Sequence, residues 1–530
     1  MKTLIRNGRL IDGTGKPGGL ADLLIDGARI AAIGSRLSAD GAQVIEAEGL
    51  AVAPGFIDTH SHSDLIALTE EDIPAKSLQG VTTEVIGQDG VGLAPLPRGY
   101  QKVWRDNIKA FEGDNDQAPW DRFETTAGYL CCLEEAGPGV NIAALAPHGN
   151  IRLEVMGLDN RRPTPEEMES LKEVCAREME AGAIGLSTGL IYNPGLYAET
   201  DELIELAKVA AAYGGIYVTH QRSEADDILA SMDETLRIGR EAGIPVHFSH
   251  FKVCGQKNWD KIGPALEKLD RARAEGLAVT FDEYPYVAGC TMLSIILPPW
   301  VGEGGNDQAL KRLADPAARK RMIADIERGL PGWDNFIDFA GLDGIIVTGV
   351  AKSRNQETVG KSLIELGRLR GTDPYNAVFD LLLDEDNNVS MVDFYGREEH
   401  IDSFLTRPEM NVSTDGCVGE APHPRMYGSF PRVLGHFARN KKLLSLEAAV
   451  HKMTGRPAQT FKLKDRGLIR NGYFADLVIF DPETIIDQGT FEHPAQSPLG
   501  ISQVMVNGVL TVDQGRLTGR RGGLVVKRQP

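Results

Sequence analysis

Two histidines stand one residue apart at the end of an apolar run, in the stretch Gly55-Phe-Ile-Asp-Thr-His60-Ser-His62-Ser-Asp64. If residues 55–60 form a strand, side chains alternate between its two faces, so His60 and His62 project the same way. Such a pair at the mouth of a strand can chelate a metal ion. A polar strand end with solvated histidines would have the same pattern, so the rest of the chain must decide between the two.

Polar side chains recur at the ends of other apolar runs along the chain. They are Asp89, His148, His220, His250 with Lys252, and Asp415. Buried polar groups need partners, and metal ligation supplies them. Imidazoles combined with a carboxylate suit zinc or another divalent transition metal, and a catalytic site keeps one position open for water. The set predicts a divalent metal site, with Zn²⁺ as the best-suited ion.

The elements that must position these residues alternate between strands and amphipathic helices. Eight strands are expected, at residues 51–58, 81–86, 141–148, 183–187, 216–220, 246–250, 279–283 and 410–415. Alternation of this kind favours the α/β class and a (β/α)8 TIM-like barrel, in which the carboxyl ends of all strands meet on one face. An open doubly wound sheet is the alternative, but the glycine-rich turns are not of the dinucleotide-binding type.

The two ends of the chain have a different sequence pattern from the middle, with short strands and turns in place of alternating strands and helices. Apolar runs closed by Asn-Gly or Asp-Gly indicate hairpins before residue 54 and again after residue 466. We therefore expect a small β-sandwich domain built from residues 1–54 and 466–530, and a barrel over residues 55–465. The stretches 93–140 and 288–345 are too long for ordinary barrel loops, and the second is predicted to be a lid insertion.

Composition narrows the class of protein further. With 530 residues and 42% hydrophobic residues, the chain can bury a large core. A net charge of −19 argues against nucleic acid and anionic membranes as partners. Six cysteines without a CxxC motif, no signal-like apolar segment at the start and no run of transmembrane length predict a reduced, cytoplasmic protein. The oligomeric state stays open.

The ordered set of strand-end residues resembles the amidohydrolase superfamily. Its members share the His-x-His after the first strand, histidines after the fifth and sixth, and an aspartate after the eighth. Within it the chain is similar to the D-aminoacylases, or N-acyl-D-amino-acid deacylases, from about residue 2 to residue 515. The similar stretches are Gly80–Gly87, Gly182–Gly195, Thr219–Glu224, Phe248–Lys252, Tyr284–Tyr286, Ser413–Gly416, His423–Arg425 and Gly428–Arg432.

This resemblance implies metal-dependent hydrolysis of the amide bond of a small N-acyl-D-amino acid. His220 and His250 would hold one tight metal site, with His60 and His62 completing it or forming a second, weaker site. Asp415 would move the proton during catalysis. Tyr192 and Lys252 match family positions that bind the substrate α-carboxylate, and a lysine suits an anion in any case. His148 is expected to orient its neighbours, and His247 to face away from His250.

The chain departs from the family pattern in two places. Asp89 stands where the familiar D-aminoacylases carry a metal-binding cysteine, and it could be a ligand or only the first residue of an Asp-Gly turn. Gly289 and Cys290 stand where relatives often have serines that shape the substrate pocket. Two other functions stay open: a cyclic-amide hydrolase of the hydantoinase or dihydroorotase kind, and a barrel scaffold that has lost its chemistry. The stretch 183–187 lacks the lysine that cyclic-amide hydrolases carboxylate.

Overall fold

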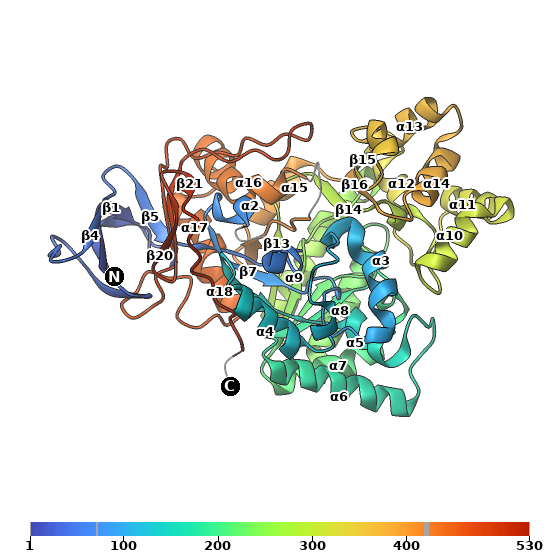
Figure 1. Ribbon diagram of the computed structural model, residues 1–530, viewed down its shortest axis with the longest axis horizontal. Coiled ribbons are helices and arrows are strands. Elements are labelled where there is room, and N and C mark those ends of the chain that lie inside the picture. Colours follow the sequence, from blue (N-terminus) through green and yellow to red (C-terminus); the bar gives the residue numbers. More distant parts are fainter. Residues whose placement is uncertain (1, 70–72, 418–422, 529–530) are drawn as a thin grey trace.

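Parallel strands lie among helices in the middle of the computed structural model (Figure 1), and their pairing order forms a ring. The structure describes residues 2–69, 73–417 and 423–528. The ring consists of β6 (Phe56–Asp58), β7 (Val81–Ile86), β8 (Asn141–Ala144) continued by β9 (Ala146–Pro147), β10 (Gly185–Gly189), β11 (Ile216–His220), β12 (Val246–Phe248), β13 (Val279–Glu283) and β17 (Met410–Val412). Each strand pairs in parallel with the next, from β6 to β8 and from β9 to β17.

The ring closes just beyond the ends of its first and last strands. The backbone N–H of Asp415, after β17, donates to the carbonyl of His60, after β6, at 2.9 Å. Ser61 and Gly416 form an isolated parallel bridge at the same place. The predicted (β/α)8 barrel is confirmed. Seven of the expected strand positions are found, but the first, 51–58, is divided, because Ala51–Pro54 joins the sheet of the small domain and only Phe56–Asp58 belongs to the barrel.

Helices surround the ring, and several of them, such as α6 (Pro165–Ala181), bury an apolar face. Helix α6 has Thr164 as its N-cap and a capping box, in which the Thr164 and Glu167 side chains bond each other's backbone N–H, and it buries Leu171, Cys175 and Met179. The other helices of the barrel part of the chain are α1 (Ile66–Thr69), α2 (Pro74–Ser77), α3 (Gln101–Glu112), α4 (Thr126–Ala136), α5 (His148–Met156), α7 (Thr200–Ala212), α8 (Ile228–Ala242), α9 (Ile262–Ala274), α15 (Glu398–Leu405), α16 (Arg425–Arg432), α17 (Leu446–Met453) and α18 (Gly455–Thr460). Among the described residues, no helix is both long enough and apolar enough to cross a membrane.

Strands from the two ends of the chain share one nine-stranded sheet, on the left of Figure 1. They are β1 (Lys2–Leu10), β2 (Gly19–Asp26), β3 (Arg29–Gly34), β4 (Gln43–Glu46), β5 (Ala51–Pro54), β18 (Leu477–Phe480), β19 (Ile501–Val506), β20 (Val509–Asp513) and β21 (Arg516–Leu517). The ends meet where Ala53 pairs with Val478. A small β domain built from both termini was predicted, and the nine strands lie within its expected limits.

Two of the predicted hairpin turns form and a third does not. The turns at Gly27 and at Asn507-Gly508 each join neighbouring antiparallel strands. Asn7-Gly8 instead forms a bulge inside β1, with Asn7 at φ 60°. A side chain at Gly8 would lie 2.5 Å from Val52 Cγ2, so close packing rather than a turn explains this glycine.

A large insertion separates β13 from α15 and has a core of its own. It contains the antiparallel strands β14 (Ala288–Met292), β16 (Val389–Phe394) and β15 (Ile345–Val350), with helices α10 (Asn306–Ala314), α11 (Pro316–Arg328), α12 (Phe336–Ala340), α13 (Leu363–Arg370) and α14 (Pro374–Asp384). It therefore continues well past the predicted range 288–345. Its first and last strands pair so that Ala288 lies opposite Phe394. In Figure 1 it stands beside the barrel in yellow and orange.

Candidate metal centre

The barrel brings six of the predicted site residues together at the carboxyl ends of its strands. His60 and His62 follow β6, Asp89 follows β7, His220 ends β11, His250 follows β12, and Asp415 follows β17. All six side chains are buried. They converge because parallel strands in a ring place the same ends on one face.

One carboxylate oxygen lies at the centre of the four imidazoles. Asp89 Oδ2 is 3.5 Å from His60 Nε2, 3.6 Å from His62 Nε2, 3.8 Å from His220 Nδ1 and 3.5 Å from His250 Nε2. Nitrogen and oxygen ligands bind zinc at about 2.0–2.2 Å, which places neighbouring ligand atoms at separations of this size. The other oxygen, Asp89 Oδ1, is buried without a hydrogen-bond partner in the described part of the chain. The donor set therefore fits a divalent metal ion.

The cluster divides into two groups that share Asp89. His220 Nδ1 lies 2.9 Å from His250 Nε2 on one side, and His60 Nε2 lies 3.4 Å from His62 Nε2 on the other. Asp415 Oδ1 completes the second group, 3.6 Å from His60 Nε2 and 3.4 Å from His62 Nε2. This arrangement can hold one ion or two, with Asp89 between them.

Three site residues have a backbone conformation that L-amino acids rarely adopt. Asp89, His250 and Asp415 have φ angles of 55°, 32° and 46°. Each lies two or three residues after the end of a barrel strand. Left-handed backbone at residues other than glycine costs free energy and concentrates at functional sites. All three therefore owe their direction to the fold around them.

The two carboxylates stay ionised although they are buried. Burial alone would raise the pKa of Asp89, but the imidazoles of His60, His250 and His220 outweigh it and hold this pKa well below its usual range. Burial would likewise raise the pKa of Asp415, and Arg425 together with His60 lowers it. An ionised Asp415 is ready to accept a proton.

Outer partners orient the cluster, and the sequence reasoning did not assign them. Arg425 Nη1 lies 2.8 Å from Asp415 Oδ2, Glu224 Oε1 lies 3.1 Å from His250 Nδ1, and Glu112 Oε1 lies 3.2 Å from His62 Nδ1. Such partners fix the ring orientation of metal-binding histidines. Glu224 and Arg425 lie within stretches that resemble the family, so the motif could have indicated them. Glu112 comes from α3, in a long connection with no local signal.

The two predicted substrate-binding residues lie beside the cluster. Lys252 Nζ donates to both oxygens of Glu224, at 2.8 and 3.0 Å, and lies 2.7 Å from His250 Nδ1. The ring of Tyr192 packs edge-on against His220, with centroids 5.5 Å apart, and its hydroxyl lies 3.1 Å from Thr291 Oγ1. Lys252 thus has a protein carboxylate as its partner in this structure.

The remaining histidines lie outside the cluster. His148 Nε2 lies 2.9 Å from Glu202 Oε1, at the start of α5. His247 faces the opposite side of β12 from His250, as expected, and its Nε2 lies 2.7 Å from Asp282 Oδ2. Asp282 also accepts a hydrogen bond from the backbone N–H of His250 at 2.7 Å. His247 therefore helps to position Asp282, which in turn binds the backbone at His250.

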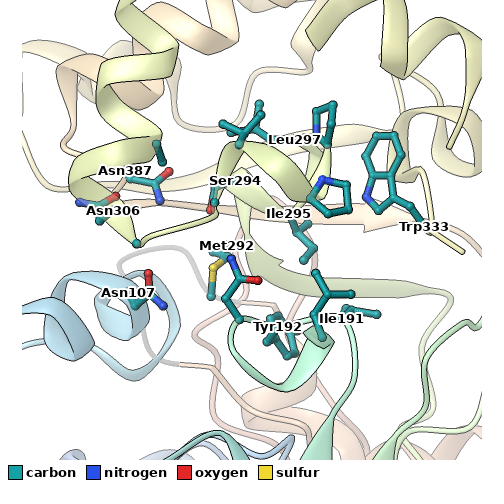
Figure 2. A pocket seen from close by; sticks show the side chains of 18 of the residues that line it. Asn107, Ile191, Tyr192, Met292, Ser294, Ile295, Leu297, Asn306, Trp333 and Asn387 are labelled. Atoms are coloured by element: carbon teal, nitrogen blue, oxygen red, sulfur yellow. The ribbon is translucent and has the colours of Figure 1, made fainter. Parts of the chain in front are cut away.

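A pocket opens above the cluster, and the insertion covers it. Its lining includes Asp89, His220, Lys252, Asp415, Arg425, Tyr192, Tyr284, Gly289, Cys290 and Asp393. A second cavity adjoins it through Ile191, Tyr192, Asp334 and Phe336. Figure 2 shows this second cavity between Ile191 and Tyr192 of the barrel and Met292, Ile295, Leu297 and Trp333 of the insertion.

A closed parallel barrel with His-x-His after its first strand and aspartate after its last defines a metal-dependent hydrolase of the amidohydrolase type. The model of the amidohydrolase family matches residues 43–327 and 365–512, and the chain belongs to this family. The gap in the match, residues 328–364, lies inside the insertion.

Individual relatives narrow the comparison to the D-aminoacylases. The chain is 38% identical over 526 residues to a D-aminoacylase of Alcaligenes xylosoxydans xylosoxydans, which covers 99% of this chain and 97% of that protein. It is 35% identical to an N-acyl-D-glutamate deacylase of the same organism, over 98% and 96% of the two chains. A solved N-acyl-D-glutamate deacylase from Bordetella bronchiseptica, with zinc and a phosphonate mimic of the tetrahedral intermediate, is 33% identical, with a TM-score of 0.82 over 99% of each chain. The resemblance found in the sequence motifs is confirmed.

Proposed function

We propose that this protein hydrolyses the amide bond of N-acyl-D-amino acids, releasing a carboxylate and a free D-amino acid. The observation that carries the proposal is the placement of Asp415 beside four imidazoles and Asp89, in a pocket that also contains Lys252 and Arg425. Full-length similarity to D-aminoacylases supports the same reaction. In β10 no lysine is present, unlike the cyclic-amide hydrolases that carboxylate a lysine there.

The chemistry divides between the metal ligands and Asp415. His220, His250 and Asp89 would hold the principal metal ion, and His60 and His62 would hold or share a second. A divalent ion bound there lowers the pKa of water and polarises the amide carbonyl. Asp415 accepts the proton of the attacking water at Oδ1 and delivers it to the leaving nitrogen. Arg425 holds the other carboxylate oxygen and so keeps Oδ1 directed at the cluster.

Two cations in the same pocket suit the α-carboxylate of the substrate. Lys252 and Arg425 line it, together with the hydroxyl-bearing rings of Tyr192 and Tyr284. A buried carboxylate needs such charged partners. With the carboxylate and the scissile carbonyl both held, only one arrangement of hydrogen and side chain at the α-carbon leads to reaction, and we assign it to the D enantiomer.

The adjoining cavity sets the side-chain preference. Its walls are mainly apolar, from Val91, Trp104, Ile295, Leu297 and Trp333. Among its described lining residues the only cation of the lysine or arginine type is Arg222, whose guanidinium already bonds Glu234 at 2.9 Å and the carbonyls of Leu196 and Ala198. An acidic substituent there would meet neutral amide and hydroxyl groups and the carboxylate of Asp334, with Arg222 as the one cation among the described lining residues. We therefore expect neutral, apolar D-amino acids to be the preferred substrates.

A panel of substrates tests this function directly. N-acetyl-D-methionine should be hydrolysed much faster than its L enantiomer and faster than N-acetyl-D-glutamate and N-acetyl-D-aspartate, and chelation of metal should abolish all turnover. Release of the free amino acid is the measurement, with metal analysis of the same sample. Faster turnover of the L enantiomer would contradict the proposed function, and faster turnover of the acidic substrates would contradict the side-chain assignment.

Replacing Lys252 by methionine should weaken hydrolysis of N-acetyl-D-methionine far more than that of N-acetyl-D-methioninamide, which lacks the carboxylate. The physical reason is that charge-assisted hydrogen bonds contribute about 1.5–3 kcal/mol, or roughly 10–100-fold in kcat/KM. Lys268→Met serves as the control, because Lys268 pairs with Asp233 on the barrel exterior. Equal losses on both substrates would instead assign Lys252 to holding Glu224 and His250 in place.

A further inference from the structure

A fully buried ammonium group lies where the first and last barrel strands meet. Lys76, on α2, has no exposed surface. Its Nζ donates to Asp58 Oδ2 at 2.6 Å, to Ser61 Oγ at 2.7 Å and to Thr414 Oγ1 at 2.8 Å. An ammonium carries three N–H donors, so all three are satisfied.

The three acceptors lie in the same two chain segments as the second group of the metal centre. Ser61 lies between His60 and His62, Asp58 ends β6 two residues before His60, and Thr414 immediately precedes Asp415. One side chain thus contacts both segments that carry the His60–His62–Asp415 group.

Other hydrogen bonds also connect these two segments. Two long ones, both 3.4 Å, run from the Thr59 hydroxyl to the Val412 carbonyl and from the Thr414 hydroxyl to the His60 carbonyl. In the described chain, β6 and β17 share no strand ladder. Beyond the strands, the N–H of Asp415 donates to His60 at 2.9 Å and that of His62 donates to Gly416 at 3.3 Å. Asp58 adds two contacts, accepting from the Thr414 N–H at 2.9 Å and from the Thr414 hydroxyl at 2.6 Å. Lys76 completes this network, since it holds Asp58 and Thr414 together.

A buried charge at this place is costly, and the surrounding charges show how the fold stabilises it. Asp58 is its direct counter-ion, and Glu84 Oε2 lies 3.8 Å away while accepting from the Ser61 hydroxyl at 2.8 Å. A well-packed apolar side chain would often stabilise a core equally well, and retained buried ion pairs can instead specify one arrangement of their neighbours. Here the arrangement specified is that of the loops after β6 and β17.

We propose that Lys76 is a positioning residue that fixes Asp415 relative to His60 and His62. It acts by joining the segments at the ends of the first and last strands of the barrel, through Asp58, Ser61 and Thr414. The inference rests on the proposed function, because it assigns Asp415 the proton transfer. Displacement of a catalytic group by about 1 Å can lower a rate by roughly 10²-fold.

The test compares two buried lysines. Lys76 contacts the segment after β17, and Lys452 contacts the segment before it. Lys76→Met should lower kcat by roughly 10²-fold with little change in KM, retain metal, and change the visible spectrum of the Co²⁺-loaded protein. Lys452→Met is the matched control, since Lys452 is also buried but donates to the carbonyl of Arg407, ahead of β17. It should leave kcat and the cobalt spectrum unchanged whatever its effect on Tm. A Lys76→Met protein with parental kcat and spectrum would overturn the proposal.

Two conservative variants of Thr414 keep the proposal testable if the Lys76→Met protein does not fold. Thr414→Val removes the hydroxyl between Lys76 and Asp58 without changing the shape of the side chain, whereas Thr414→Ser keeps the hydroxyl. We expect the valine variant to lose kcat and shift the cobalt spectrum, and the serine variant to behave like the parent. Equal behaviour of the two variants would overturn the proposal. The cobalt spectrum needs no substrate, so a parent protein inactive on every acyl-D-amino acid would refute the proposed function while the spectrum still tests Lys76.

Discussion

Replacing Asp415 by asparagine should lower kcat by roughly 10²–10⁴-fold while the protein keeps its fold and its metal. Asparagine preserves the shape of the side chain and, like aspartate, tolerates the left-handed backbone at φ 46°. It cannot accept a proton as a carboxylate does. The measurement is kcat for N-acetyl-D-methionine alongside metal content and Tm.

Asp465→Asn is the matched control for the Asp415 variant. Asp465 also has a positive φ, 58°, but lies outside the site and pairs with Arg29. Its replacement should leave kcat unchanged. If Asp415→Asn retained the parental kcat, Asp415 would have no part in proton transfer.

Replacing Asp89 by asparagine should release most of the bound metal and abolish most of the activity with it. The carboxylate lies 3.5–3.8 Å from nitrogens of four imidazoles and is the anionic ligand that the two groups share. Loss of an outer partner of a metal ligand typically costs about 10–100-fold in affinity, and loss of this central group should cost more. Metal content after dialysis, measured by atomic emission, checks the expectation.

Asp89→Cys distinguishes a ligand from a turn residue. A thiolate at this position should restore metal binding and shift the preference toward zinc, because oxygen ligands accommodate manganese, cobalt and nickel better than sulfur does. If Asp89→Asn bound metal and turned over substrate like the parent, Asp89 would only begin the Asp-Gly turn, and the histidines would be the sole ligands.

The barrel and the metal cluster could be predicted because both depend on local patterns. Short apolar runs marked the strands, and a polar residue at the end of each run marked the face on which the runs converge. His60, His220 and Asp415 were therefore found without any knowledge of distance. The hairpin turn at Asn507-Gly508 is equally local, and it too appears where expected.

Features that depend on contacts between distant segments could not be predicted. Glu112 reaches His62 from α3, fifty residues along the chain, and nothing in its own surroundings distinguishes it from a surface glutamate. Lys76 looks like an ordinary lysine near a helix end until the fold closes around it. The Asn7-Gly8 pair has the composition of a turn, but Val52 packs against Gly8 and the strand continues. The insertion extends past residue 345 because β16 returns to pair with β14 and β15, and a pairing between distant segments leaves no local signal.

The pairing of Ala288 with Phe394 gives the insertion adjacent points of entry and exit. The insertion has its own core and leaves and rejoins the barrel at neighbouring residues. It can therefore be lengthened, shortened or exchanged while the backbone of the barrel keeps its path. The proposed metal ligands all lie at the barrel strand ends, whereas much of the wall of the adjoining cavity belongs to the insertion. Substrate range can therefore diverge among relatives through exchange of one module, without any change to the residues that break the amide bond.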